Sequence, residues 1–259
     1  MRLFALAAPV LLLLTACTSV LPTPTPVPAG EGRFPVTYED APTFTGARDL
    51  LQRSGVLEEL AADVDDRILV PTDIPIVAME CGESNAYYDP ELHRIELCYE
   101  LVDEFRTSFS AGGEPADEVN RDVLGTVAET YVHELAHALI DVLDLPFTGR
   151  EEDVADQLAS YWLINNTRGG PDLVLSAAES YRLTAQSTAP EDLAFDDPHS
   201  LDIQRYTNHL CYLYGSDDER FGYLVDSGEL PEDRAANCGD EYDQLVRGWE
   251  NLLRPFTQR

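Results

Sequence analysis

The sequence contains no lysine. All 17 basic residues are arginine, and 48 acidic residues bring the formal net charge to -31 at pH 7. A surface with so few cations repels nucleic acid and anionic lipid headgroups. The composition therefore excludes nucleic-acid binding, and it excludes membrane attachment through a basic patch. An acidic surface instead favours basic or neutral peptides as partners.

The sequence also lacks an apolar run of the length that a membrane helix needs, about 20 residues. The run from Leu3 to Leu14 is shorter, and with Arg2 before it the pattern predicts a secretion signal. The residues Leu14-Thr15-Ala16-Cys17 resemble the lipobox of bacterial lipoproteins, which implies cleavage before Cys17 and lipid attachment to it. We expect residues 1–16 to be a lipoprotein signal peptide and the mature protein to be lipid-anchored in the cell envelope, on the external side of a bacterial membrane. The alternative is an ordinary signal cleaved nearby, which leaves a soluble secreted protein.

A proline-rich stretch follows the predicted anchor. Prolines alternate with other residues from Leu21 to Pro28, a pattern that favours an extended polyproline II spacer. We expect residues 17–33 to form a tether and residues 34–259 to form a single domain, in which no internal repeat or heptad is visible. The sequence makes no prediction of oligomeric state.

Cysteine is scarce, and none of the cysteines forms a C-x-x-C pair. Without Cys17, four remain in a chain predicted to enter an oxidising compartment, so we expect two disulfides. The sequence-local pairs Cys81–Cys98 and Cys211–Cys238 are favoured among the three connectivities, because each closes one short loop. A second metal site built from these cysteines is the alternative, but it lacks the usual ligand spacing.

Strand patterns precede helical patterns along the domain. Strand candidates are residues 67–70, 76–81, 85–88 and 94–99, the last two flanking an Asp89-Pro90 turn. Helical spacing covers residues 47–64, broken at Ser54-Gly55, and a long run over residues 117–143. Strands followed by helices indicate an α+β fold. We expect a small, mainly antiparallel sheet followed by a predominantly helical part.

The long helical run contains one H-E-x-x-H motif, formed by His133, Glu134 and His137. On a helix the two histidines stand one turn apart on one face, so both imidazoles can bind one zinc ion (Zn²⁺). Glu134 then lies beside the open position of the ion and can act as the general base. The motif predicts a zinc-dependent hydrolase.

A catalytic zinc site usually has three protein ligands, and the next predicted helix offers the third. Thr148 and Glu151 form a T-x-x-E pattern, which predicts that Glu151 caps this helix. Glu152 and Asp156 lie one turn apart on a face that otherwise looks buried. We expect Glu152 to be the third ligand and Asp156 to accept a hydrogen bond from a ligating histidine. The alternatives are Asp156 as the ligand, or two carboxylates that solvate a helix end.

The predicted reaction is hydrolysis of a peptide bond, with Glu134 passing a proton from water to the leaving amine. The oxyanion that develops needs a further donor, and His199, Arg205 and Tyr206 are candidates, with His199 our choice for a catalytic role. A surface or capping role for His199 is the alternative. We expect His209 to be packed or solvated. Elsewhere, we expect Asp141 and Asp144 to be exposed rather than ligating.

These residues also carry a family resemblance. Glu134 in its motif, followed by Glu152 and Asp156 in an E-x-x-x-D spacing, resembles the gluzincin branch of zinc metallopeptidases. A wider pattern resembles a bacterial metallopeptidase family catalogued as a domain of unknown function, and the similarity spans nearly all of residues 34–259. That pattern consists of Cys81-Gly82, residues 85–90, residues 95–100, the helix pair, residues 197–200 with Gln204-Arg205, and residues 230–238. The resemblance implies a zincin-like fold in which the strand around Ile95 lies along the cleft and pairs with an extended substrate.

Three interpretations follow: a zinc peptidase acting on peptides or proteins, a zinc-binding lipoprotein without catalysis such as a metal buffer, and an inactive scaffold. The presence of Glu134 favours the first, because a buffer requires ligands but no general base. A degenerate scaffold is expected to have lost at least one of His133, Glu134, His137 or Glu152, and all four are present.

Overall fold

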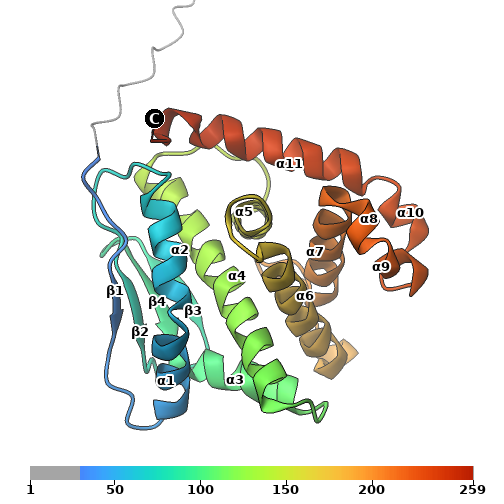
Figure 1. Cartoon of the computed structure of the whole chain (residues 1–259), viewed down its shortest axis with the longest axis horizontal. Helices are drawn as coiled ribbons and strands as arrows, with labels where there is room; N and C mark the ends of the chain where they lie inside the picture. The colour runs from blue at the N-terminus through green and yellow to red at the C-terminus, as the bar shows by residue number, and fades with distance from the viewer. Residues whose placement is uncertain (1–29, 259) are drawn as a thin grey trace, which may run out of the picture.

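The computed structural model describes residues 30–258, and it begins with a small sheet (Figure 1). Its strands are β1 (Val36–Tyr38), β2 (Ile76–Met79), β3 (Ala86–Asp89) and β4 (Arg94–Cys98), in the order β1-β2-β4-β3. The sheet precedes a helical part, so the predicted α+β class is confirmed. The predicted signal peptide, Cys17 and nearly all of the tether lie outside the described residues.

The sheet is mixed, and the expectation of a mainly antiparallel sheet was wrong. β1 pairs with β2 and β2 pairs with β4 in parallel, whereas only β3 and β4 are antiparallel. The reason lies in the connections. A short turn joins β3 to β4 and requires an antiparallel pair, but α1 (Thr45–Ser54) and α2 (Val56–Asp65) carry the chain back between β1 and β2, which permits a parallel pair.

The predicted elements before β2 were partly right. The break at Ser54-Gly55 is confirmed, because Gly55 has φ +67 and separates α1 from α2. Residues 67–70 do not form a strand; Ile68 makes one isolated bridge to Thr257 near the end of the chain. β1 was not predicted, since three residues are too few to show a period.

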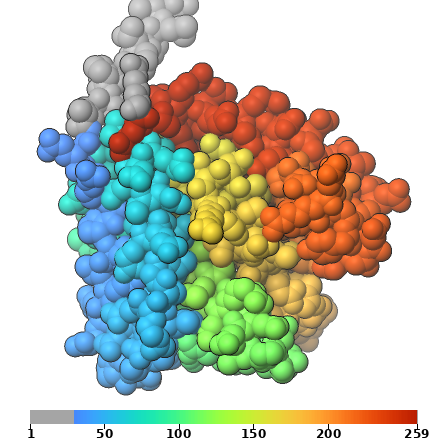
Figure 2. All heavy atoms as spheres, in the orientation of Figure 1, coloured from blue at the N-terminus to red at the C-terminus, as the bar shows by residue number. Residues whose placement is uncertain are grey.

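The helical part is built around α4 (Ala116–Val142), which lies between the sheet and the later helices (Figure 1). α3 (Tyr99–Ser110) precedes it, and α5 (Glu151–Asn166) and α6 (Gly170–Ser187) pack beside it. α7 (Asp202–Ser216) packs on α6 and, less extensively, on α5. In Figure 2 the N-terminal segments cover one side of the molecule and the last helices the other, with α5 (yellow) visible between them. None of the helices in residues 30–258 combines the length and apolarity that crossing a membrane requires.

The chain ends in short helices and one long one that crosses over the bundle (Figure 1). These elements are η1 (Pro190–Asp192), α8 (Asp218–Phe221), α9 (Tyr223–Asp226), α10 (Glu232–Ala235), α11 (Cys238–Leu253) and η2 (Arg254–Phe256). One cluster of buried side chains runs through both parts of the fold, from Phe34 to Phe256. The sheet and the helices therefore share a core.

Both predicted disulfides are confirmed. Cys81 and Cys98 are joined with 5.4 Å between their Cα atoms, which ties the loop before β3 to the end of β4. Cys211 and Cys238 are joined with 5.1 Å between their Cα atoms, which ties α7 to the start of α11. The first bond thus fixes β4, which contacts α4, and the second fixes α7, which packs on α6.

The contact between α4 and α6 depends on Gly125. A Cβ at this position would lie 2.7 Å from the Cβ of Ser176 and 3.3 Å from the Cα of Leu173. Only glycine allows α4 to approach α6 this closely, because those atoms belong to a rigid helix. By contrast, a Cβ at Gly248 on α11 would meet nothing within 4 Å.

We therefore expect Gly125→Ala to lower the free energy of unfolding by about 1 to 3 kcal/mol, the usual cost of overpacking. Gly248→Ala is the matched control, and it should raise stability slightly because alanine is the better helix former. Thermal or urea denaturation measures both. A Gly125→Ala protein as stable as the parent would contradict the close packing described here.

Candidate metal centre

The two histidines of the motif meet on the buried face of α4. His133 and His137 are one turn apart, and their Nε2 atoms lie 3.2 Å from each other. His133 is almost fully buried, because α5 and α6 pack over α4. The sequence pattern therefore places both imidazoles in the interior, where each ring nitrogen needs a partner.

Glu152 joins them from the first turn of α5. Its Oε2 lies 3.1 Å from His133 Nε2 and 3.3 Å from His137 Nε2. Hydrogen bonding to His133, then to His137 and His199, holds the pKa of this carboxyl far below its usual range, although burial opposes the shift. Glu152 is thus an anionic oxygen donor at the point where the two imidazoles converge.

A carboxylate lies against the other nitrogen of each ring. Asp156 Oδ1 is 2.8 Å from His133 Nδ1, and Glu151 Oε1 is 2.8 Å from His137 Nδ1. A carboxylate only accepts, so each Nδ1 carries the proton. When the rings are neutral, each Nε2 lone pair faces inward toward Glu152.

Glu151 therefore has a different place from the one predicted. α5 begins at Glu151 with Arg150 as its N-cap, and no side chain makes a capping hydrogen bond there. Gly149, with φ +104, turns the chain after Thr148, so the helix starts too late for a T-x-x-E cap. Glu151 contacts His137 instead. The sequence feature that could have indicated this contact is the position of Glu151 next to Glu152, in the first turn of the helix that faces the motif.

Electron-pair donors crowded this closely repel one another unless a cation or protons lie between them. Burial lowers the pKa of His133, but hydrogen bonds to Asp156 and Glu152 outweigh it and raise the value to about 10. Protons can thus occupy the site, and a metal ion that replaces them would be bound by the same atoms. His133, Glu152 and His199 each offer a ligand atom within 4.8 Å of the other two.

Arg205 fixes Asp156 from behind. The guanidinium donates from Nε to Asp156 Oδ2 at 2.8 Å and from Nη2 to Oδ1 at 2.6 Å. Burial raises the pKa of Asp156, but the charge of Arg205 and the bond to His133 outweigh it and hold the pKa well below its usual range. Arg205 was a candidate oxyanion donor from the sequence, but these two N–H groups donate to Asp156 instead.

His199 lies at the rim of the same centre. Its Nε2 is 2.9 Å from Glu152 Oε2, its Nδ1 is 2.9 Å from Asp197 Oδ1, and its ring stacks on that of His133 with 5.9 Å between centroids. Hydrogen bonding to Glu152 raises the pKa of His199 above its ordinary value. The structure brings this predicted residue to the metal centre from a loop between α6 and α7.

Glu134 faces a cavity of about 710 Å³ beside the centre. It is 7 % exposed, and burial raises its pKa, although the two imidazoles and the backbone N–H of Tyr88 oppose the shift. A carboxyl with a raised pKa next to a cavity suits a group that takes and returns a proton. The cavity is lined by Tyr88, Asp141, Tyr181 and His199 among others.

The strand at this cavity is β3. The resemblance placed the strand around Ile95 along the cleft, and this was wrong, because Ile95 belongs to β4, which is paired on both sides. β3 is the edge strand, and its residues Ala86, Tyr87 and Tyr88 line the cavity. The hairpin signal was read correctly, but the strand order cannot be seen in the sequence.

The remaining candidates lie elsewhere or have other partners. The hydroxyl of Tyr206 points to Glu229, with 3.4 Å to its Oε2. Asp141 and Asp144 are exposed, as predicted. His209 is packed, with Nε2 3.1 Å from Glu129 Oε1, and Glu129 is a buried carboxylate that sequence reasoning missed. Its position one helical turn before His133 was the available signal.

Asp156→Asn should weaken metal binding. The amide keeps the shape of the carboxyl but lacks its charge, and its NH₂ group only donates, so it cannot replace the carboxylate oxygen that accepts from Arg205 or His133. Loss of such a partner typically costs about 10- to 100-fold in metal affinity. Competition with a chelator measures the change.

Asp172→Asn serves as the control, because Asp172 also pairs with an arginine, Arg220, but at the exposed start of α6. Its metal affinity should equal that of the parent. If Asp156→Asn bound metal as tightly as this control, Asp156 would have no part in holding the centre.

A family model described as "putative metallopeptidase" matches residues 38–253, which include every residue of the centre. No curated protein matches the chain, and no solved structure matches it.

Proposed function

Because the chain belongs to this metallopeptidase family, we propose that it is a zinc-dependent peptidase in which Glu134 is the general base. The proposal rests on one observation. Three inward-facing donors, His133 Nε2, His137 Nε2 and Glu152 Oε2, converge with separations of 3.1 to 3.3 Å. They lie on the wall of the cavity that Glu134 also faces.

The spacing of these donors supports zinc as the ion. Zinc binds nitrogen and oxygen at about 2.0 to 2.1 Å, and two ligands of a tetrahedron at that distance are about 3.3 to 3.4 Å apart. The donor separations fall close to this value without any rearrangement. Two imidazoles with one carboxylate are also a common set in catalytic zinc sites, which leave the fourth position open.

When bound, zinc supplies a Lewis acid that polarises the scissile carbonyl and makes water acidic enough to attack at neutral pH. Glu134 accepts the proton of the attacking water and returns it to the leaving amine. Its raised pKa favours the first transfer, because a more basic carboxylate accepts the proton of water more readily. His199 donates from Nε2 to the developing oxyanion, held in place by Asp197.

β3 supplies the surface on which the substrate lies. As the edge strand, it can pair through its backbone with an extended peptide, and its residues already line the cavity. The hydroxyl of Tyr88 donates to Asp141 on α4 at 2.7 Å, which fixes the strand against the catalytic helix. A peptide or protein is therefore the proposed substrate.

The proposed site of action is outside the cytoplasm, with lipid at Cys17 as the anchor. The signal-like N-terminus and the lipobox-like Leu14-Thr15-Ala16-Cys17 support this location. The two disulfides also support it, because such bonds persist in oxidising compartments.

Glu134→Gln tests the catalytic proposal. The parent should contain about one zinc per chain by elemental analysis, and it should cleave unstructured peptides. The variant should retain its zinc but lose activity by about 100-fold or more, since the amide cannot accept a proton. Asp144→Asn, a change of the same kind just beyond α4, should leave both properties unchanged. A parent without zinc would overturn the proposal.

A second function, zinc storage without catalysis, is favoured by one observation. His199 Nε2 lies 2.9 Å from Glu152 Oε2, so a fourth protein donor is at hand and could close the site. Structural zinc sites have four protein ligands, whereas catalytic sites keep one position open. The role of His199 separates the two functions.

His199→Ala is the test. If His199 stabilises the oxyanion, kcat should fall by about 100- to 1000-fold, as for other such donors, while zinc affinity changes little. If His199 is a fourth ligand, zinc affinity should fall steeply instead. Isothermal titration with zinc, alongside peptidase kinetics, distinguishes the outcomes, and the second result would favour storage.

A further inference from the structure

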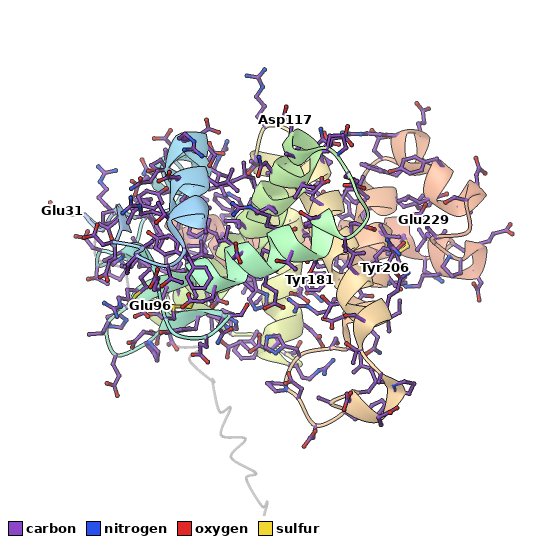
Figure 3. All side chains as sticks on the ribbon, turned by 90° about the horizontal axis from the view of Figure 1, so that it is seen from below. Glu31, Glu96, Asp117, Tyr181, Tyr206 and Glu229 are labelled. Atoms are coloured by element: carbon purple, nitrogen blue, oxygen red, sulfur yellow. A yellow bond between two sulfur atoms is a disulfide. The ribbon has the colours of Figure 1, made fainter. Side chains whose placement is uncertain are left out.

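Behind the metal centre, four helices bring polar side chains into the core. Glu129 and His209 are completely buried, on α4 and α7 respectively. Tyr181 on α6 lies beside them, in the middle of the molecule in the view of Figure 3. A buried carboxylate and imidazole are costly unless each is fully paired.

The contacts of His209 define its charge. Nδ1 lies 2.8 Å from the backbone oxygen of Arg205, and Nε2 lies 3.1 Å from Glu129 Oε1. A carbonyl oxygen only accepts, and so does a carboxylate, so both nitrogens must carry protons. His209 is therefore an imidazolium paired with the Glu129 carboxylate, and the pair is neutral as a unit.

The other oxygen of Glu129 connects the pair to Arg205. The hydroxyl of Tyr181 donates to Glu129 Oε2 at 3.1 Å, and the guanidinium of Arg205 lies over the Tyr181 ring at 4.1 Å from its centroid. Arg205 is thus held at its backbone by His209 and at its side chain by Tyr181. The Nε and Nη2 atoms of the same guanidinium donate to Asp156.

The chain of contacts ends at a metal ligand. Asp156 Oδ1 receives bonds from both Arg205 Nη2 and His133 Nδ1. Two cations, the buried His209 and the partly buried Arg205, balance two buried carboxylates, Glu129 and Asp156. Loss of one carboxylate leaves its cation to compete for the remaining carboxylate. A change at Glu129 is therefore transmitted to Asp156, the partner of His133.

We propose that the Glu129–His209 pair, with Tyr181, is a positioning device that fixes Arg205 and thereby holds Asp156 and the His133 ring in the orientation required for metal binding. This inference rests on the proposed function for the identity of the ion, but the contacts that carry it lie outside the ligand set. Glu129, His209 and Tyr181 are positioning residues, since they act through Arg205.

Glu129→Gln is the principal test. We expect it to reduce zinc affinity about tenfold, the lower end of the range for groups hydrogen-bonded to a ligand, because it acts one contact further away. Tyr181→Phe keeps the ring beneath Arg205 and removes only the hydroxyl bond, so its loss should be smaller. Zinc affinity is measured by chelator competition on the folded full-length chain, with thermal unfolding followed in parallel.

Glu96→Gln is the matched control. Glu96 is another buried carboxylate that accepts from a tyrosine, Tyr87, and pairs with an arginine, Arg94, but it stands on β4 and has no link to Asp156. It should lose stability as Glu129→Gln does, yet bind zinc as the parent does. Equal zinc affinity in the two variants would reduce the pair to a purely structural role and overturn the inference.

A double variant covers the case in which Glu129→Gln does not fold. Glu129→Gln with His209→Gln removes both charges. Its zinc affinity should equal that of His209→Gln alone, because loss of either partner already breaks the pair. Additive losses would contradict a paired device.

Nitrogen NMR of the histidine rings separates failure of this inference from failure of the proposed function. In the parent, the spectrum should show both nitrogens of His209 protonated and the Nδ1 of His133 hydrogen-bonded to a carboxylate. Glu129→Gln should change the His133 signals, whereas Glu96→Gln should not. A parent that binds no zinc but shows these changes would refute the proposed function alone. A zinc-binding parent without them would refute the positioning device.

Discussion

The candidate metal centre depends on the hydrogen bond that fixes Nδ1 of His133. An imidazole presents its Nε2 lone pair in one direction only if its other nitrogen donates to a partner that cannot move. Asp156 is that partner, and the charge of Arg205 keeps it ionised in the interior. The packing of α4, α5 and α7 serves this requirement, because each helix supplies one member of the series His133, Asp156, Arg205.

The same requirement explains how α4 can carry so many polar groups in a core. Glu129, His133 and Glu134 are all buried on it. Each of the first two is paired with a group from another helix, so the cost of desolvation is offset within the network. Glu134 faces the cavity instead, where burial raises its pKa and leaves it free to exchange a proton. One helix thus holds a rigid donor set and a reactive carboxyl side by side.

Local patterns predicted what depends on neighbours in sequence. The motif on α4 and the E-x-x-x-D spacing on α5 involve residues whose relation is set by helix geometry, and each disulfide closes a loop of fewer than 30 residues. The parallel pairing of β1 with β2, the placing of β3 at the edge and the pairing of Glu129 with His209 depend on how distant segments pack. For Glu151 a local pattern gave the wrong role. The T-x-x-E spacing predicted a cap, but Gly149 turns the chain so that the helix begins later, and Glu151 contacts His137 instead.

The chain order of the centre has a consequence for its biosynthesis. The motif and Glu152 lie in the middle of the chain, whereas His199, Arg205 and His209 come from the loop before α7 and from α7 itself. A nascent chain that has not yet reached α7 contains the ligands, but Asp156 has no guanidinium beside it and His133 has no fixed orientation. Synthesis from the N-terminus therefore completes the centre late, after α4, α5 and α6 have all been made. A chain that ends before α7 therefore contains His133, His137 and Glu152 but lacks the groups that hold Asp156 in place.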